Sequence, residues 1–307
     1  MAKNTSQYIM NSDVSRLSDK ELVNRIESIE RVPKHVIDEY YRRCIPLYLD
    51  FLGTHWHTGF YLDDQYDVSA KDQIRMIDHL ASLVDLAPGH KVLDVGCGIG
   101  ASLIHLRQRF SVTATGLTPV PEQKKMAEYL AQQYKVSIKV DLGHAESLPY
   151  PDHSFDTLMF FESACHFEDR AAFFREAHRV LKPGGKLIGE DWVCLPCPEQ
   201  SAESSLVNNI CKTWAIPMLG TPTEYQSLMA NAGLNKIEVT DMRELMPLHR
   251  GFAVTESDQA ELRSDIAQCS EPLLQLTLKG IASLGIAFKA GVFSIAQFAA
   301  QKPTEEV

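Results

Sequence analysis

Residues 91–100 of the chain have the sequence Lys91-Val92-Leu93-Asp94-Val95-Gly96-Cys97-Gly98-Ile99-Gly100. The apolar residues up to position 95 predict a buried parallel strand, because such strands carry nearly continuous apolar runs. Three glycines at alternate positions follow. Because glycine has no Cβ, they allow a sharp turn and a close approach of the backbone to a ligand. The periodic segment 102–110 predicts a helix whose N-terminus faces the same place.

The rest of the chain alternates between strand and helix patterns. Besides 91–95, strands are expected at 111–116, 137–141, 155–161, 186–193, 235–241 and 291–299, and helices at 100–109, 121–134, 170–181 and 222–232. A turn at 182–185, Lys-Pro-Gly-Gly, precedes the fifth strand. This alternation predicts an α/β fold with a doubly wound, mostly parallel sheet of seven strands. Ligands of such sheets bind at the carboxyl ends of the strands.

The sequence predicts a lid followed by a core. Residues 1–68 are expected to form an N-terminal helical and aromatic lid, with a polar start at 1–20 and helix boundaries at Pro33 and Pro46. Residues 69–307 are expected to form the core, which opens with a helix at 69–85. Helical cap insertions are expected at about 195–220 and 245–287, over the carboxyl edge of the sheet.

Composition excludes several classes of protein. Of the 307 residues, 45% are hydrophobic and 23% are charged, which is ordinary for a soluble enzyme. No apolar run reaches the ~18 residues of a membrane span, and the polar N-terminus lacks a secretory pattern, so we expect a cytoplasmic protein without a membrane partner. The net charge of −10 argues against nucleic acid as a partner. The seven scattered cysteines fit a reducing compartment, and the Cys194–Cys197 pair lacks a second pair of zinc ligands. A homo-oligomer is left open.

The glycine spacing D-x-G-x-G-x-G differs from the dinucleotide pattern G-x-G-x-x-G. It resembles motif I of the class I S-adenosylmethionine (SAM)-dependent methyltransferases. Further stretches in the expected order resemble motifs of the same family: Gly116–Gln123, Gly143–Tyr150, Pro151–Asp156 and Phe174–Gly185. The resemblance is strong over residues 75–195 and implies a Rossmann-like fold, SAM as cofactor and a small-molecule substrate.

The resemblance also implies which residues contact SAM. They are Asp94, Gly96, Cys97, Gly98, Gly100, Thr118, Gln123, Ala145, Glu146 and Phe161. Thr118 and Gln123 stand where most members of the family place an acidic residue for the ribose. This variant is similar to that of cyclopropane-fatty-acid synthases and of tocopherol-type and prenyl-diphosphate C-methyltransferases. His144 stands where the family has an Asp beside the adenine amine, so that carboxylate is missing here.

The fourth strand ends in Glu162, which is followed by Ser163 and, four residues on, by His166. A carboxylate at the tip of an apolar strand is partly desolvated, which raises its pKa and suits a general base. His166 titrates near neutrality and shares a face with Glu162 if the segment is helical. The pattern E-S-x-x-H resembles the active site of methyltransferases that modify small molecules at C, N or O. With Tyr41, these two residues are the candidate catalytic residues. The structural alternatives are a helix cap for Glu162 and packing on the cofactor for His166.

Eight aromatic residues fall between positions 40 and 66. They fit either the hydrophobic core of a lid or an apolar pocket whose aromatic faces stabilise a cation. The candidate substrate-binding residues are Tyr41, Tyr48, Trp56, His57, Arg42, Arg43 and Trp214.

Two chemistries remain open. The first is C-methylation of an isoprenoid alkene, such as geranyl or farnesyl diphosphate, through a carbocation that a base quenches, with or without cyclisation. A diphosphate needs cations and can bring Mg²⁺, although no metal ligands are evident; candidate basic residues are Arg42, Arg43, Lys212, Arg243, His249 and Arg250. The second is O- or N-methylation of a sugar, phenol or amine. A protein that binds SAM without catalysis is a third hypothesis, which the intact glycine turn and Glu162 oppose.

Overall fold

The computed structural model describes residues 13–62, 70–248, 252 and 256–304. The strands are β1 (Lys91–Val95), β2 (Thr113–Thr118), β3 (Lys139–Leu142), β4 (Phe155–Phe161), β5 (Leu181–Cys194), β6 (Asn235–Asp241) and β7 (Phe293–Gln301). They form one sheet of seven strands in the order β3-β2-β1-β4-β5-β7-β6. Only β7 runs antiparallel to its neighbours, β5 and β6. The predicted fold class is therefore confirmed.

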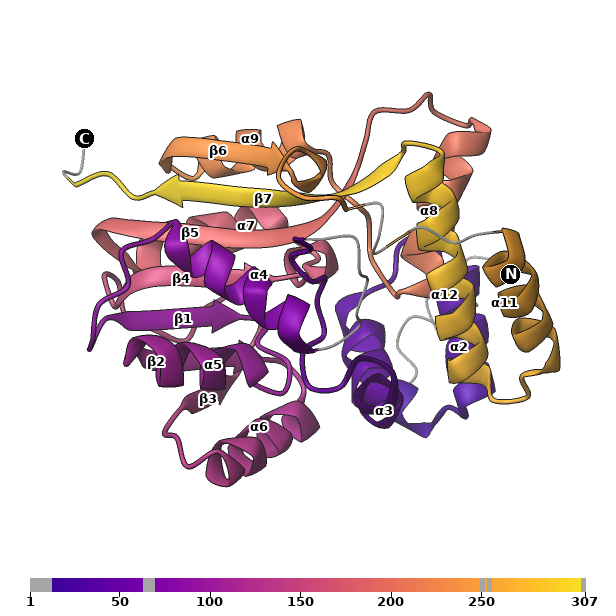
Figure 1. The fold of residues 1–307 in the computed structure, drawn as a ribbon, viewed down its shortest axis with the longest axis horizontal. Coiled ribbons are helices and arrows are strands. Elements are labelled where there is room, and N and C mark those ends of the chain that lie inside the picture. Colours follow the sequence, from indigo (N-terminus) through magenta and orange to yellow (C-terminus); the bar gives the residue numbers. More distant parts are fainter. Residues whose placement is uncertain (1–12, 63–69, 249–251, 253–255, 305–307) are drawn as a thin grey trace, which may run out of the picture.

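Helices cover both faces of the sheet, as Figure 1 shows. They are α4 (Ala70–Ser82), α5 (Ala101–Phe110) and α6 (Pro121–Gln133) on one face and α7 (Arg170–Val180) and α9 (Pro222–Asn231) on the other. Apolar side chains from α4 and α5, such as Ile77 and Leu103, join one core cluster, and Phe173 and Tyr225 from α7 and α9 join the other. The fully buried aromatic and aliphatic residues of these two clusters supply most of the apolar burial that stabilises the domain.

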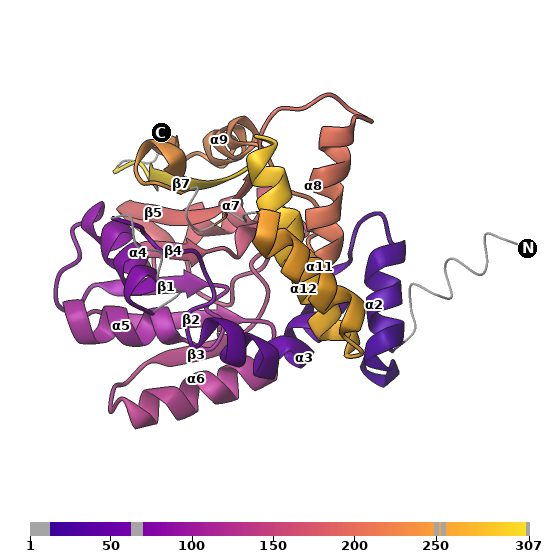
Figure 2. The same ribbon diagram turned by 45° about the vertical axis from the view of Figure 1, so that its right-hand side comes forward.

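The remaining helices gather at the carboxyl ends of the parallel strands, on the right in Figure 1, and Figure 2 shows them from the side. They are α2 (Asp19–Ser28), α3 (Lys34–Leu52), α8 (Ala202–Thr213), α11 (Glu256–Gln268) and α12 (Pro272–Lys289). An ion pair between Lys279 and Glu27 (2.9 Å) joins α12 to α2. Trp214, which follows α8, packs against Gly280 of α12, where a Cβ would lie only 2.6 Å from the indole. Segments from both ends of the chain thus build one cap over the sheet edge.

Several predicted boundaries are wrong. Helix α3 continues through Pro46, because buried side chains before and after it, such as Tyr40 and Tyr48, hold the helix against the cap. The expected turn at 182–185 lies inside β5, where a register shift and Gly184 at φ 77° accommodate it. The cap insertion expected at about 245–287 contains two helices, α11 and α12, and α12 continues to Lys289. The lid boundary expected at residue 68 and part of the polar start lie outside the described residues.

No helix in the described parts of the chain combines the length and apolar character that a membrane crossing requires.

Candidate active site

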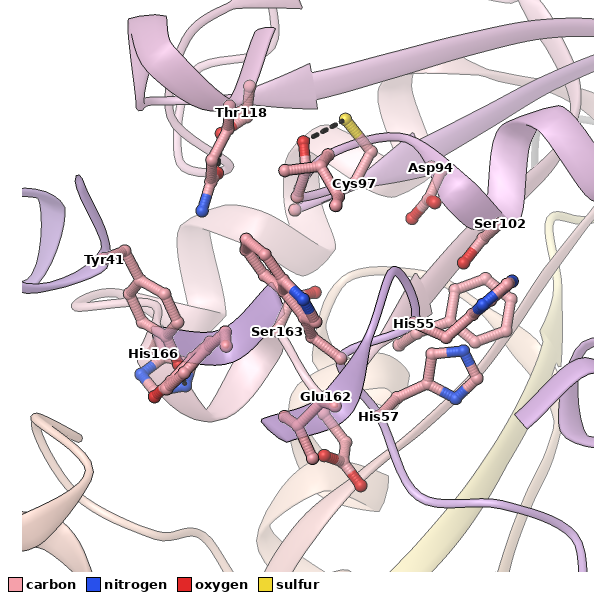
Figure 3. A pocket seen from close by; sticks show the side chains of 18 of the residues that line it. Tyr41, His55, His57, Asp94, Cys97, Ser102, Thr118, Glu162, Ser163 and His166 are labelled. Carbon is pink, nitrogen blue, oxygen red and sulfur yellow. Dashed lines mark hydrogen bonds between the residues drawn. The ribbon is translucent and has the colours of Figure 1, made fainter. Parts of the chain in front are cut away.

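A cavity of about 500 Å³ lies between the carboxyl ends of the strands and the cap (Figure 3). Its walls come from the turns after β1, β2 and β3, the tip of β4, helices α3 and α12, and the lid loop 53–61. The segments that carry the sequence motifs therefore meet in one space.

The turn after β1 brings backbone directly to this cavity. Gly96 and Gly98 adopt φ of 84° and 51°, conformations that side chains with a Cβ rarely take. A Cβ on Gly96 would collide with Ser163, whose hydroxyl donates to the Val95 carbonyl (2.7 Å) and ties the β4 tip to β1. Above Gly98 the nearest side chain is Trp56, 3.6 Å from the position of a Cβ.

Asp94 lies beneath this turn, 1% exposed, and its Oδ1 has no hydrogen-bond partner in the part of the chain that the structure describes. Burial raises the pKa of Asp94 to about 8. An unpartnered buried carboxyl oxygen is costly unless a ligand supplies a donor. The site therefore fits a ligand that brings an amino group to Asp94.

After β2, Thr118 fixes the orientation of Gln123. The Thr118 hydroxyl donates to Oε1 of Gln123 (2.5 Å), and the Val120 N–H donates to the same hydroxyl (3.2 Å). The amide oxygen of Gln123 is thereby used inside the protein. The group that Gln123 can offer to a ligand in the cavity is its amide N–H.

Glu162 stands at the tip of β4 with φ 44°, in the left-handed region. Its Oε1 accepts a hydrogen bond from the Thr58 N–H of the lid loop (2.9 Å). Desolvation raises the pKa of Glu162 to about 7, although contacts with Thr58 and Trp192 pull it down. Glu162 is half-buried because one side of it lines the cavity. This carboxyl can take up or release a proton near neutral pH.

His166 faces the same space from a short 3₁₀ turn, Ala164–His166, and pairs with Tyr41 of α3. Its Nε2 lies 2.6 Å from the Tyr41 hydroxyl. Desolvation lowers the pKa of His166 to about 4 and raises that of Tyr41 well above its ordinary value. At neutral pH both groups are therefore uncharged, and a single proton is shared along this hydrogen bond. The imidazole is a weaker base than the carboxylate of Glu162.

The lid loop is held to the core by Gln73 of α4. The Gln73 amide donates to the carbonyls of His55 (2.5 Å) and His57 (3.1 Å). Both imidazoles line the cavity, and burial lowers their pKa values to about 4 and about 3. His57 Nδ1 lies 3.0 Å from the Thr58 carbonyl, so that nitrogen carries the proton and Nε2 offers a lone pair.

Comparisons with known proteins agree with this arrangement. Residues 93–189 match the family model described as a methyltransferase domain. The chain is 32% identical over 195 residues to 27-O-demethylrifamycin SV methyltransferase from Amycolatopsis mediterranei. The aligned region covers 62% of this chain and 71% of that relative. The chain belongs to the class I SAM-dependent methyltransferases.

Two further relatives within the methyltransferases differ in the atom they modify. Identity is 32% over 227 residues to the chloroplastic tocopherol O-methyltransferase of Arabidopsis thaliana, covering 68% of this chain and 65% of the relative. The chain is 31% identical over 220 residues to glycine/sarcosine/dimethylglycine N-methyltransferase of Actinopolyspora halophila, and the aligned region covers 70% of this chain and 38% of that relative. The chain thus spans less than two thirds of the length of these two relatives.

Solved structures show the same fold. The crystal structure of the [4+2]-cyclase SpnF gives a TM-score of 0.72 at 23% identity, covering 90% of this chain and 99% of that chain. A second structure is that of the geranyl diphosphate C-methyltransferase of Streptomyces coelicolor A3(2) in complex with Mg²⁺, geranyl diphosphate and S-adenosyl-L-homocysteine. It gives a TM-score of 0.68 at 18% identity and covers 88% of this chain and 97% of that chain.

The cofactor of this methyltransferase is SAM, and the cavity fits it. The backbone at Gly98 leaves room for the methionine end of SAM, whose amino group matches the buried Oδ1 of Asp94. The amide N–H of Gln123 can donate to the ribose hydroxyls. All the candidate site residues line the cavity except Gly100, Arg42 and Arg43.

The three exceptions have other surroundings. Gly100 packs beneath the turn, where a Cβ would lie 2.9 Å from that of Ala127. Arg42 and Arg43 bind Glu39 of their own helix, and Arg43 also binds Asp19. Of the other basic candidates, Lys212 and Arg243 are absent from the cavity walls, and His249 and Arg250 lie outside the described residues.

The structure also adds residues that the sequence did not indicate. They are Lys34, Asp38, His55, Gln73, Trp192 and Phe252. The sequence could have indicated Asp38, because it lies three residues before the candidate Tyr41 and a helix places both on one face. Gln73 and Trp192 had none, because their cavity-facing positions depend on packing between distant segments. In the described residues, no cluster of His, Cys, Asp or Glu has the arrangement of a metal site.

Proposed function

We propose that this methyltransferase transfers the methyl group of SAM to an uncharged, largely apolar small molecule, and that Glu162 takes the proton which the acceptor loses. The observation that carries the proposal is the pairing of a carboxyl whose pKa is about 7 with aromatic walls in one cavity. An isoprenoid alkene is our first candidate acceptor.

The walls support an apolar acceptor. Tyr48 packs edge-on against Tyr41 and Trp56, with ring centroids 5.9 and 5.4 Å apart, and Trp214 lies 6.3 Å from it. Phe161, Trp192, Phe252 and Leu284 complete the apolar lining. Aromatic faces also stabilise positive charge, which an alkene develops when it accepts a methyl group.

The charges of the cavity favour an acceptor without a diphosphate. Lys34 is the only Lys or Arg among the described residues of the lining, and Asp38 lies on the same helical face. A diphosphate would need several cationic partners or a metal site to offset its charge. Farnesol-like or geraniol-like chains fit these walls better than their diphosphates.

The chemistry is a displacement at carbon. SAM supplies an electrophilic methyl group on its sulfonium. The π electrons of the acceptor form the new carbon–carbon bond as the carbon–sulfur bond breaks, and the positive charge moves to the acceptor. The Glu162 carboxylate then accepts a proton from the carbon next to the cation, which restores an alkene.

A phenol or alcohol is the second candidate acceptor. The specific observation is that polar residues from two segments line the cavity together, His57 from the lid loop and Glu162 from the tip of β4. In this case Glu162 would take the hydroxyl proton as the oxygen attacks the methyl group.

The test is transfer of labelled methyl from SAM to three acceptors: geraniol or farnesol, geranyl diphosphate with and without Mg²⁺, and a prenylated hydroquinone. We expect label on a carbon of the free isoprenoid, with no requirement for Mg²⁺. Label on an oxygen of the alcohol or of the hydroquinone would move the assignment to O-methylation. Turnover of the diphosphate alone would overturn the proposal of an uncharged acceptor.

A further inference from the structure

The cavity has a distinct far end, away from the methyl-transfer site. Its walls follow the strand order, from Glu162 at β4 through the glycine turn of β1 to the segments after β2 and β3. Since the methyl group must lie near Glu162, the adenosine of SAM extends over β1 and β2 toward β3. Leu117, Val120, Ala145 and Phe167 give this end flat apolar walls that suit a purine.

One carboxylate at this end comes from the cap and not from the sheet. The segment after β3 offers His144, which has no carboxylate. Asp38 of α3 lines the same end, and its Oδ2 lies 3.7 Å from Nε2 of His144. This distance is longer than a hydrogen bond, so the Asp38 carboxylate keeps the capacity to accept one.

The other carboxylate nearby, that of Glu146, is engaged through one of its two oxygens. Oε1 of Glu146 accepts the main-chain N–H groups of Glu168 (2.9 Å) and Asp169 (3.4 Å), where it holds the start of α7. Among the described residues, no main-chain N–H donates to Asp38. Desolvation raises the pKa of Asp38 to about 6, with opposing effects from His144 and Lys34, so the group is mostly ionised at neutral pH.

We infer that Asp38 accepts the hydrogen bond from the 6-amino group of the adenine of SAM, and that it determines the specificity of this methyltransferase for an adenine base. The inference rests on SAM binding and is independent of the acceptor. A residue of the cap thus replaces the carboxylate that position 144 lacks.

The position of Asp38 links the two ends of the cavity. Tyr41 lies three residues later on the same face of α3 and bonds His166 beside the methyl-transfer site. Binding of adenine at Asp38 therefore holds α3 in the position that places Tyr41.

The experiment measures binding without turnover, by calorimetry. The ligands are S-adenosylhomocysteine and S-inosylhomocysteine, in which an oxo group replaces the 6-amino group. For the native chain we expect a preference of about 10- to 100-fold for the adenine compound, the range for a hydrogen bond to a charged group. Asp38→Ala should reduce this preference to less than about threefold. Asp50→Ala, at an exposed position of the same helix, should leave it unchanged.

A second variant separates recognition from structural damage. Asp38→Ala combined with His144→Asp returns a carboxylate to the β3 side and should restore most of the preference. If Asp38→Ala weakens both ligands equally, Asp38 only holds the cap closed and the inference fails. A preference that survives in Asp38→Ala would also overturn it. Loss of turnover on any acceptor has no bearing on either result.

Discussion

Glu162 and His166 line one cavity, and burial favours the uncharged form of each. For the carboxyl this means a pKa of about 7, and for the imidazole a pKa of about 4. A base works best when its pKa is close to the working pH, because it is then both deprotonated and proton-attracting. Glu162 meets this condition and His166 does not.

We expect Glu162→Gln to retain SAM binding and to lose about 10²- to 10⁴-fold in turnover, the usual contribution of a general base. In the native chain, turnover should rise with pH through a midpoint near 7, because only the carboxylate accepts a proton. Initial rates from pH 5.5 to 8.5 measure this midpoint.

His166→Gln is the matched control for that midpoint. Because the pKa of His166 lies near 4, its removal should leave the midpoint in place even if it lowers the rate. Near-native activity of Glu162→Gln, or a midpoint that disappears with His166, would show that Glu162 is not the base.

At the residue scale, Glu162 was predicted from its place at a strand end, and Asp94 and Gln123 from the resemblance to the methyltransferase motifs; each lines the cavity. Arg42 and Arg43 were predicted as cationic partners of a diphosphate, yet both bind Glu39, and Arg43 also binds Asp19. The downward shift in the pKa of His166 was also beyond the sequence, because α3 and the segment after α8 cause its burial.

Among the elements, the lid loop 53–61 depends on α4 for its position. The Gln73 amide donates to the His55 and His57 carbonyls of the loop, and the loop in turn supplies the Thr58 N–H to Glu162. The loop therefore connects Gln73 to the Glu162 carboxyl.

Gln73→Ala should lower the free energy of unfolding by about 1–3 kcal/mol, because two carbonyls lose their donor. It should also raise the pH midpoint of turnover, since the contacts of Thr58 hold down the pKa of Glu162. Urea unfolding and pH–rate profiles measure the two effects.

Gln275→Ala provides the comparison. Gln275 also donates to two carbonyls, those of Ile266 (3.0 Å) and Cys269 (3.3 Å), but it lies on α12. Its loss should cost stability without moving the midpoint. If both variants leave the midpoint unchanged, the loop does not tune Glu162.

The elements themselves were largely predictable, because most of them carry local periodicity and boundary residues. Helices α6 and α9 begin at the prolines that the pattern indicates, Pro121 and Pro222. The failures arose where tertiary packing overrode a local preference. Helix α3 continues through Pro46 because the residues on both sides of it are buried. The Pro-Gly-Gly segment belongs to β5 because the residues around it pair with β4 and β7.

For the molecule as a whole, several carboxyls are kept away from water. Burial raises the pKa of Asp94 to about 8 and of Asp191 to about 6, and raises that of Glu190 well above its ordinary value. Both carboxyl oxygens of Glu190 are buried, and neither has a hydrogen-bond partner within the described ranges. These groups bind protons more tightly in the folded state, so their contribution to stability is complete below pH about 4 and is lost as pH rises through the folded pKa values.

The buried histidines act in the opposite sense. Their folded pKa values lie below 6.5, so their contribution is present above that pH and is lost as pH falls toward 4. The two groups of residues oppose each other between pH 4 and 6.5. Above pH 6.5 the carboxyls act alone, and stability should decline.

We therefore expect the melting temperature at pH 8.5 to be lower than at pH 6.5 by at least about 2 °C. Thermal unfolding of the ligand-free chain at pH 6.5, 7.5 and 8.5 measures this. Glu190→Gln should make the decline shallower, because it removes one of the protons bound by the folded state. A melting temperature that rises over this interval would show that these carboxyls do not control stability.

The scarcity of basic side chains in the cavity has a consequence for the order of events in a catalytic cycle. The described walls contain five carboxyls, those of Asp38, Asp72, Asp94, Glu146 and Glu162, and one lysine. Burial keeps Asp94 largely protonated and Glu162 partly protonated at neutral pH, and the remaining carboxyls still outnumber the lysine. SAM enters with a sulfonium charge, and S-adenosylhomocysteine leaves without it. Each turnover thus removes the positive charge that these walls attract. The cavity should therefore bind SAM more tightly than S-adenosylhomocysteine, and inhibition by this product should be weak. Because added salt screens the charges, the difference between the two affinities should shrink as the salt concentration rises.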